Sequence, residues 1–440
     1  MISEKNILDA LRQIIDPDFN KDIVTLGFVK NIKIAGGNVT FDIALTTPAC
    51  PVKSEFQRQA EEAVRALHGV KEVQVNMTTQ PFQRPAAAQD TPSTLSNVRS
   101  IIAVSSCKGG VGKSTLAAHL AQELAHRRFK VGLVDVDIHG PSVPTIFNLS
   151  KAEIYVNKDK QFIPIEKNNL KIMSFGFLLG DAPAVMRGPI VSRYVQQILH
   201  QTAWGELDYL FIDMPPGTGD VQLTITQTAR LNGAVIVTTR QTLSLVDVSR
   251  GILMFEKVAV PILGIIENMS YFICDKCSKK HYIFGGNEKT DLQERFGIET
   301  LAEIPLLPSF MSKIETPIAN EFMMHAVDKV VMALGKSKLL QQDIPMIKFD
   351  AKQVNLKWKD ETEISVNNRD LRLNCRCALC VNELSGEQIL KEKDIPTDIA
   401  PKEIFPLGNY ALGISWNDAH SSGIYPYKMM KELAQYIKLR

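Results

Sequence analysis

Continuously apolar runs separated by helical patterns fill the middle of the chain. The runs are IIAVSS, KVGLVDV, YLFID, GAVIVTT and PILGIIENM, and a helical pattern begins near Lys113, shortly after the first of them. Strands that are buried on both faces of a sheet have this composition. Because strands alternate with helices, the pattern predicts an α/β fold with a doubly wound, mainly parallel sheet over residues 99–335.

Two smaller segments flank this core, and each mixes helical and strand patterns. Residues 1–83 open with apolar positions at helical spacing and continue into strands such as VTFDIAL. Residues 347–440 combine short strands with a C-terminal helical stretch. We therefore predict a small α+β domain on each side of the core. Residues 84–98, rich in Pro, Ala, Ser and Thr, are predicted to be a linker, and a weaker break is predicted at 335–345.

The C-terminal helical stretch, YKMMKELAQYIKLR, is basic and has one apolar side. That side is formed by Met429, Met430, Leu433 and Ile437. A membrane anchor and a helix that docks on its own domain both fit the pattern, and the docking helix is the better interpretation.

The composition limits the number of domains and the classes of partner, but it adds no detail to the predicted fold. A chain of 440 residues suggests about three domains at roughly 150 residues each. Its 50 Lys and Arg nearly balance 48 Asp and Glu, so no overall field favours nucleic acid or an anionic membrane, and neither is a predicted partner. The N-terminus has no hydrophobic signal core, which predicts a cytoplasmic location.

The stretch CKGGVGKST carries the chemistry of a phosphate-binding loop. Its glycines let the backbone turn N–H groups onto phosphate oxygens, and the following helix adds its positive end. Lys113 is placed to bridge the β- and γ-phosphates of ATP, and the Ser114 hydroxyl to ligate Mg²⁺. The residues predicted to hold the nucleotide are Gly109, Gly110, Val111, Gly112, Lys113, Ser114 and Thr115.

Acidic residues follow two later strands. GLVDVDIHG places Asp135 and Asp137 at the end of one strand, and YLFIDMPPGTGD places Asp213 at the end of another. Ligands of open parallel sheets bind outside these strand ends. Asp213 can hold the Mg²⁺ shell through water, while one of Asp135 and Asp137 can orient the attacking water.

These motifs together resemble the Mrp/ApbC family of deviant Walker A ATPases, which carry iron–sulfur clusters. The resemblance rests on KGGVGKST, DVDIHGPSVP, MRGP, FIDMPPGTGDVQLT and ENMSYFICDKC, and covers residues 99–335. It implies that Lys108 reaches into the nucleotide of a partner subunit, so that the protein works as a homodimer. It also implies that Asp137 orients the water and that Asn268 contacts adenine. The alternative for Lys108 is a solvated surface lysine.

Seven cysteines in a chain predicted to be cytoplasmic favour metal ligands over disulfides. Cys274 and Cys277 supply only two thiolates, whereas a 4Fe–4S cluster or zinc needs four ligands. A symmetric dimer provides four, which is the arrangement that the family resemblance implies. A zinc site with His281, which lacks a visible fourth ligand, and a dithiol redox pair are the alternatives.

Two further cysteines stand alone. Cys107 lies in the phosphate loop, where a small residue packed beneath the loop is the better interpretation and an auxiliary cluster or redox role the alternative. Cys50 lies in TPACP within a segment similar to PaaD/SufT-type iron–sulfur assembly domains. Cys50 is predicted either to contact a cluster or partner transiently, as a thiolate favoured by a helix start, or to have no chemistry.

The last segment contains three cysteines within six residues. Cys375, Cys377 and Cys380, with His420, make a closed four-ligand set that suits structural zinc. This segment resembles the N-terminal module of γ-butyrobetaine hydroxylases, a zinc-binding domain. The alternative is that these four residues bind an iron–sulfur cluster.

The prediction is therefore an ATP-dependent carrier or scaffold that holds a 4Fe–4S cluster between two subunits and passes it to apoproteins, alongside other assembly proteins. A MinD/ParA-like spatial-partitioning ATPase shares the loop and its extra lysine, but leaves the cysteine clusters unexplained. An ATP-driven electron donor like nitrogenase reductase needs separated cluster cysteines rather than an adjacent pair.

Overall fold

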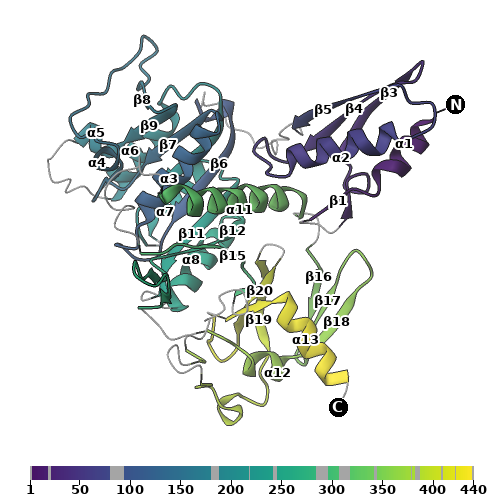
Figure 1. The fold of residues 1–440 in the computed structure, drawn as a ribbon. Helices are drawn as coiled ribbons and strands as arrows, with labels where there is room; N and C mark the ends of the chain where they lie inside the picture. Colours follow the sequence, from purple (N-terminus) through teal and green to yellow (C-terminus); the bar gives the residue numbers. More distant parts are fainter. Residues whose placement is uncertain are drawn as a thin grey trace. The chain divides into compact units, whose positions relative to one another are not determined.

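The computed structural model describes residues 2–17, 21–79, 94–179, 188–217, 219–240, 245–283, 296–306, 318–340, 344–377, 379–381, 387–407, 410–421 and 423–438. The chain divides into two compact units, and Figure 1 shows their elements. Met1–Thr91 and Asp328–Leu339 form one unit, and Pro92–Val327 and Leu340–Arg440 form the other. Part of the predicted linker, residues 84–93, lies outside the described residues, and Thr94–Asn97 form a 3₁₀ turn, η1.

An eight-stranded sheet in the order β15-β12-β11-β6-β10-β7-β9-β8 is the centre of the larger unit (Figure 1). All neighbouring strands pair in parallel except β8 and β9, which are antiparallel. This confirms the predicted α/β fold with a mainly parallel sheet. The strands are β6 (Val98–Ser105), β7 (Val131–Asp135), β8 (Ile165–Lys167), β9 (Leu170–Ser174), β10 (Leu207–Asp213), β11 (Gly233–Thr239), β12 (Ile262–Asn268) and β15 (Thr300–Glu303).

The helices of this unit follow the strands and bury the apolar side chains between them. Every residue of β7, β11 and β12 is buried, as expected for strands covered on both faces. The helices are α3 (Lys113–His126), α4 (Val143–Ile146), α5 (Phe175–Leu179), α6 (Gly188–His200), α7 (Asp220–Thr228) and α8 (Leu245–Lys257). Alternation of strand and helix therefore brings the carboxyl ends of the strands to one edge of the sheet.

The C-terminal part of the same unit contains two antiparallel three-stranded sheets. They are β16 (Met346–Phe349), β17 (Gln353–Lys357) and β18 (Glu363–Asn367), and β19 (Pro401–Leu407), β20 (Ala411–Trp416) and β21 (Gly423–Pro426). Helices α12 (Asn368–Leu373) and α13 (Tyr427–Lys438) and a 3₁₀ turn, η3 (Glu392–Asp394), complete it. Met429 and Met430 of α13 are buried in this core, which supports the docking interpretation of the last helix.

The smaller unit is built on β3 (Val29–Ala35), β4 (Asn38–Leu45) and β5 (Glu72–Thr79). β3 and β4 are antiparallel, β4 and β5 parallel, and a separate pair is β1 (Ile15–Asp16) and β2 (Lys21–Asp22). Helices α1 (Glu4–Leu11) and α2 (Lys53–Arg65) provide the rest of its core.

Helix α11 (Ile318–Leu340) contributes its last turns to the smaller unit and extends into the weaker break predicted at 335–345. Gly335 faces Thr46, whose Oγ1 lies 2.5 Å from the position that a Cβ at residue 335 would take. This glycine therefore marks a close approach rather than the end of a helix. Among the described residues, no helix combines the length and apolarity needed to cross a membrane.

Candidate nucleotide-binding and metal-binding sites

The phosphate loop runs from the end of β6 to the start of α3, as the sequence predicts. Gly110 and Gly112 have φ values of 79° and 81°, in the left-handed region that glycine adopts at low cost. A Cβ at Gly112 would lie 2.3 Å from Nδ2 of Asn268, so a side chain at this position has no room. The Asn268 amide donates to the Val111 carbonyl at 2.9 Å and thus holds the loop from the end of β12.

Lys113 and Asp213 meet at the first turn of α3. The Lys113 ammonium donates to Oδ1 of Asp213, and both side chains are buried. Lys113 also lies 3.3 Å from the Ser114 hydroxyl. The second oxygen of Asp213, Oδ2, is buried without a hydrogen-bond partner. A buried carboxylate oxygen left without a partner beside a serine hydroxyl fits an Mg²⁺ ion with its bound water.

Asp135 and Asp137 have different surroundings. Asp135 pairs with Asp213 in the β7–β10 register, and its carboxylate accepts hydrogen bonds from the Asp137 and Val143 N–H groups and the Ser174 hydroxyl. Burial and the nearby charge of Asp213 raise the pKa of Asp135 to about 7. Asp135 therefore anchors the loop that carries Asp137, while Asp137 itself stays half-buried at the edge of the site.

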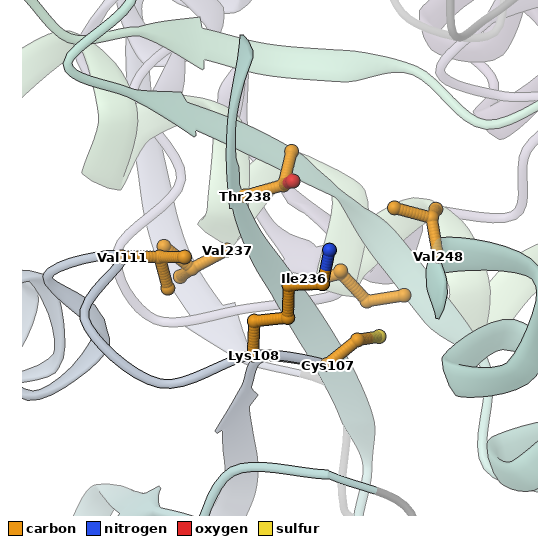
Figure 2. A pocket seen from close by; sticks show the side chains of 7 residues that line it. All are labelled: Cys107, Lys108, Val111, Ile236, Val237, Thr238 and Val248. Carbon is orange, nitrogen blue, oxygen red and sulfur yellow. The ribbon is translucent and has the colours of Figure 1, made fainter. Parts of the chain in front are cut away.

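Cys107 and Lys108 line a pocket beside the phosphate loop. Figure 2 shows Lys108 lying alongside Ile236 of β11 and Cys107 turned to the side on which Val248 of α8 lies. Lys108 is exposed. The Cys107 sulfur lies 2.6 Å from the position that a Cβ at Gly251 of α8 would take. This close packing supports the interpretation of Cys107 as a small residue seated against α8.

Cys274 and Cys277 lie in the turn of a two-stranded hairpin formed by β13 (Phe272–Ile273) and β14 (Lys280–His281). Cys277 is exposed and Cys274 is half-buried. The backbone N–H groups of Cys277 and Lys276 and the Cys277 thiol donate to the Cys274 sulfur and lower its pKa. The hairpin therefore presents two neighbouring sulfurs, and the pKa of Cys274 is lowered by the hydrogen bonds that its sulfur accepts.

Among the described residues, one chain does not complete a four-ligand set at this hairpin. In the part of the chain that the structure describes, the one group of three or more ligand side chains with mutually close donor atoms is in the C-terminal part. His281 belongs to β14, but it does not join the two cysteines in such a group. The single chain does not bring Cys274, Cys277 and His281 together as a group of close donor atoms, and their zinc site stays an untested alternative.

Cys375, Cys377, Cys380 and His420 come together inside the C-terminal core, as predicted. The Nε2 atom of His420 lies 3.3, 3.5 and 4.0 Å from the three sulfurs in that order. All four residues are buried, and their donor atoms lie within 4.8 Å of one another. Three thiolates and an imidazole in a closed cavity fit tetrahedral zinc.

Residues that sequence reasoning missed surround these four ligands. Arg372 of α12 donates to the Cys380 sulfur at 3.3 Å and to Asp418 at 2.9 Å. Asp418 in turn accepts from the His420 backbone N–H at 3.0 Å. A buried guanidinium offsets the excess negative charge of three thiolates on a divalent ion. Arg372 and Asp418 lie within three residues of a predicted ligand, but only the fold shows that they meet.

Metal content tests this four-residue centre. We expect about one zinc per wild-type chain and almost none in a Cys375→Ser variant, because a tetrahedral structural site rarely tolerates the loss of a ligand. The melting temperature of the variant should fall, since its cysteines form part of the C-terminal core. Elemental analysis after dialysis measures the zinc. Cys50→Ser, which changes a thiol of the smaller unit, should keep the wild-type zinc content.

Cys50 lies three residues before the start of α2, and its carbonyl accepts from the Lys53 N–H at 3.2 Å. It lines a pocket of the smaller unit together with Asp16, Thr47, and Val331 and Gly335 of α11. The thiol is half-buried. Its position at this pocket fits either prediction made for Cys50.

Family models match the three predicted segments in order. The model described as NUBPL iron-transfer P-loop NTPase matches residues 97–336, more than half of the chain. The chain belongs to this family. An iron–sulfur cluster assembly protein model matches residues 4–76, and a γ-butyrobetaine hydroxylase-like N-terminal model matches residues 346–431. These matches confirm the three resemblances proposed from sequence.

Individual relatives agree with this assignment to the NUBPL iron-transfer family. The "Fe-S cluster assembly factor HCF101, chloroplastic" of Arabidopsis thaliana is 44% identical, over 99% of this chain and 84% of the relative. An "Iron-sulfur cluster carrier protein" of Synechocystis is 42% identical, over 70% of this chain and 88% of the relative. A solved nucleotide-binding protein of Archaeoglobus fulgidus, in complex with ADP, is 38% identical over 54% of this chain and 90% of its own, with a TM-score of 0.45.

Proposed function

We propose that this protein is an ATP-dependent iron–sulfur cluster carrier that works as a homodimer. In this proposal Cys274 and Cys277 of both subunits hold one 4Fe–4S cluster and transfer it to recipient apoproteins. The observation that carries it is the exposed hairpin with two adjacent sulfurs, of which Cys274 has a lowered pKa. Two such hairpins facing each other supply the four thiolates that a cubane cluster needs.

The ATPase site supplies the energy for this transfer. Mg²⁺ neutralises phosphate charge when it is bound with ATP. Lys113 and the loop amides hold the phosphates, Ser114 and Asp213 hold the metal shell, and Asp137 orients the attacking water. Asp135 fixes the Asp137 loop through its three hydrogen bonds. In this proposal Asn268, which ties the loop to β12, also contacts the adenine base.

Lys108 completes the neighbouring subunit's site in this proposal. Its side chain is exposed beside the phosphate loop, so it is available to a second copy of the chain. A cation that reaches the transferred phosphoryl group from a partner stabilises transition-state charge, as an arginine finger does. ATP binding and hydrolysis would then change the contact between subunits, and with it the access of apoproteins to the cluster.

The remaining parts have supporting roles. Zinc held by Cys375, Cys377, Cys380 and His420 would stabilise the C-terminal core. The N-terminal domain, which resembles cluster assembly proteins, would meet those proteins or the recipients. A cytoplasmic location, and the exclusion of nucleic acid and membrane as partners, stay predictions. A spatial-partitioning role has no use for the two neighbouring sulfurs of the hairpin, and we do not favour it.

Anaerobic reconstitution with iron and sulfide tests the cluster site. The wild-type chain should take up about four iron and four sulfide per dimer, with visible absorbance from thiolate-to-iron charge transfer. A Cys274→Ser/Cys277→Ser variant should take up almost none, because the remaining hairpin offers no soft ligand.

The matched control is Ser278→Ala, which removes an exposed hydroxyl from the same turn and keeps both sulfurs. It should load as the wild type does. Equal iron and sulfide in the double-serine variant and the wild type would rule the proposal out. Transfer is then measured as activation of an apo-aconitase-type acceptor mixed with the loaded protein.

A further inference from the structure

Arg240 is a buried charged residue that neither the nucleotide site nor the cysteine hairpin explains. It follows β11 directly, and its side chain is only 8% exposed. Its guanidinium Nε donates to Oε2 of Glu267 at 3.2 Å and to the Ser270 hydroxyl at 3.1 Å. Nη2 lies 3.8 Å from a carboxylate oxygen of Glu303, so two carboxylates face one cation.

The partners of Arg240 flank the residue that holds the phosphate loop. Glu267 directly precedes Asn268 at the end of β12, and Asn268 donates to the Val111 carbonyl. Ser270 follows two residues later, and its backbone N–H donates to the Ile304 carbonyl at 2.9 Å. The Ile304 N–H in turn donates to the Glu267 carbonyl at 2.8 Å. Arg240 therefore binds residues on both sides of Asn268, at the end of β12 from which Asn268 reaches the phosphate loop.

The guanidinium also contacts the cysteine hairpin through one of its faces. Its central carbon lies 4.5 Å from the ring centre of Tyr282, the residue that follows β14. Tyr282 packs edge-to-face against Tyr271, with ring centres 5.9 Å apart, and the Lys280 ammonium lies 4.3 Å from the Tyr271 ring centre. At the base of the hairpin, cation–ring and ring–ring contacts therefore form a continuous row that begins at Arg240.

One side chain therefore contacts both the strand end that holds the phosphate loop and the base of the hairpin that carries Cys274 and Cys277. Arg suits this place because its planar fork binds carboxylates while its face stacks on an aromatic ring, whereas Lys offers a compact charge without that face. Movement of Asn268 that follows nucleotide binding would reach the hairpin through Glu267, Arg240 and Tyr282.

We propose that Arg240 is a positioning residue that couples the phosphate loop to the cysteine hairpin, so that bound nucleotide sets the accessibility of Cys274 and Cys277. The inference deepens the proposed function, because it names the path by which ATP acts on the cluster ligands. It does not require that a cluster is bound, since the path consists of protein groups alone.

Alkylation of the hairpin cysteines in the cluster-free protein measures this coupling. Iodoacetamide labelling of Cys274 and Cys277 is followed by peptide mass spectrometry, with and without Mg²⁺ and a non-hydrolysable ATP analogue. We expect the analogue to change the wild-type rate by roughly 5-fold or more, as allosteric couplings typically do. In Arg240→Lys the change should fall below about 2-fold, because charge is kept but the fork and the stack are lost.

Matched substitutions separate coupling from a merely structural role. Tyr282→Leu should weaken the nucleotide effect as Arg240→Lys does, whereas Tyr282→Phe, which keeps the ring, should retain it. The affinity for the analogue, measured by fluorescent-nucleotide displacement, should stay within about 2-fold of wild type in all three variants, so that only the coupling changes.

Each outcome of these measurements either supports or overturns the coupling proposed for Arg240. The inference is overturned if the wild-type labelling rate does not respond to the analogue, or if Arg240→Lys and Tyr282→Leu respond as the wild type does. Loss of nucleotide affinity in Arg240→Lys would also overturn it, since that marks a folding role. If the wild type fails to load a cluster, the proposed function is wrong. The labelling experiment still tests the coupling, because it uses the cluster-free protein.

Discussion

Replacing Lys108 with alanine is expected to lower ATP turnover by about 1,000-fold or more while ATP still binds. The magnitude is that of cations supplied in trans to a transferred phosphoryl group. Affinity should change little, because the Lys108 side chain is exposed, and in the proposed site Lys113 and the loop amides hold the phosphates. Steady-state hydrolysis and equilibrium binding of a fluorescent analogue measure the two effects separately.

Mixing two inactive variants shows whether Lys108 acts across the dimer. Lys108→Ala lacks the lysine, and Asp137→Ala lacks the carboxylate proposed to orient water. In a mixed dimer, one site has its own Asp137 and the partner's intact lysine, so it is complete. Random mixing in a symmetric dimer then restores about a quarter of wild-type activity.

A lysine that serves its own subunit gives a different result, since no site in a mixed dimer is then complete. Activity that stays at the level of the separate variants would show that Lys108 acts within its own chain, and the dimer argument would lose its main support. The control is Lys151→Ala, which removes an exposed lysine outside the loop and should leave turnover unchanged.

The parts of the site that sequence predicted are those written in short, continuous motifs. The loop glycines, Lys113 and the acidic residues at the strand ends are fixed by local backbone and by the parallel sheet, in which carboxyl ends meet at one edge. The four ligands of the C-terminal centre were also accessible, because three lie within six residues and one histidine was available in that segment.

What sequence could not predict are contacts between distant positions. The different surroundings of Asp135 and Asp137 depend on Ser174 and Val143, which approach Asp135 only through the β7–β9 pairing and the following helix. Arg240 meets Tyr282 across more than forty residues, and no local pattern indicates it. The sequence predicts a weaker break at 335–345, but α11 continues to Leu340, and Gly335 lies close to Thr46.

Asp213→Asn is expected to abolish the effect of Mg²⁺ on nucleotide affinity and to lower turnover by about 100-fold or more. In the structure Lys113 is paired with Asp213, and both are buried. In the proposed site ATP binding separates them, since the phosphates take Lys113 and the metal shell takes the Asp213 carboxylate. In the wild type, the free energy lost when the Lys113–Asp213 pair separates is therefore regained only when Mg²⁺ binds together with the nucleotide.

Replacing the Asp213 carboxylate with an amide affects both its pairing with Lys113 and its place in the metal shell. Its carbonyl oxygen still accepts from Lys113, so the free protein keeps the contact, but a neutral acceptor holds the ammonium less strongly than a carboxylate does. Lys113 is then released more easily, and affinity for ATP without Mg²⁺ should equal or exceed that of the wild type. Titrations of ATP with EDTA and with Mg²⁺ give the two affinities for each variant.

The comparison with Asp137→Asn makes the result specific to the metal. Asp137 is half-buried and is not paired with Lys113 in the described structure, where its Oδ1 accepts from the His139 N–H at 3.2 Å. Its amide variant should lose turnover yet bind Mg²⁺ and ATP together as tightly as the wild type. If Mg²⁺ still tightens ATP binding to Asp213→Asn as much as to the wild type, Asp213 does not hold the metal shell, and its partnerless Oδ2 has another explanation. Loss of the Mg²⁺ effect in Asp213→Asn alone, with turnover reduced in both variants, assigns the metal shell to Asp213 and the attacking water to Asp137.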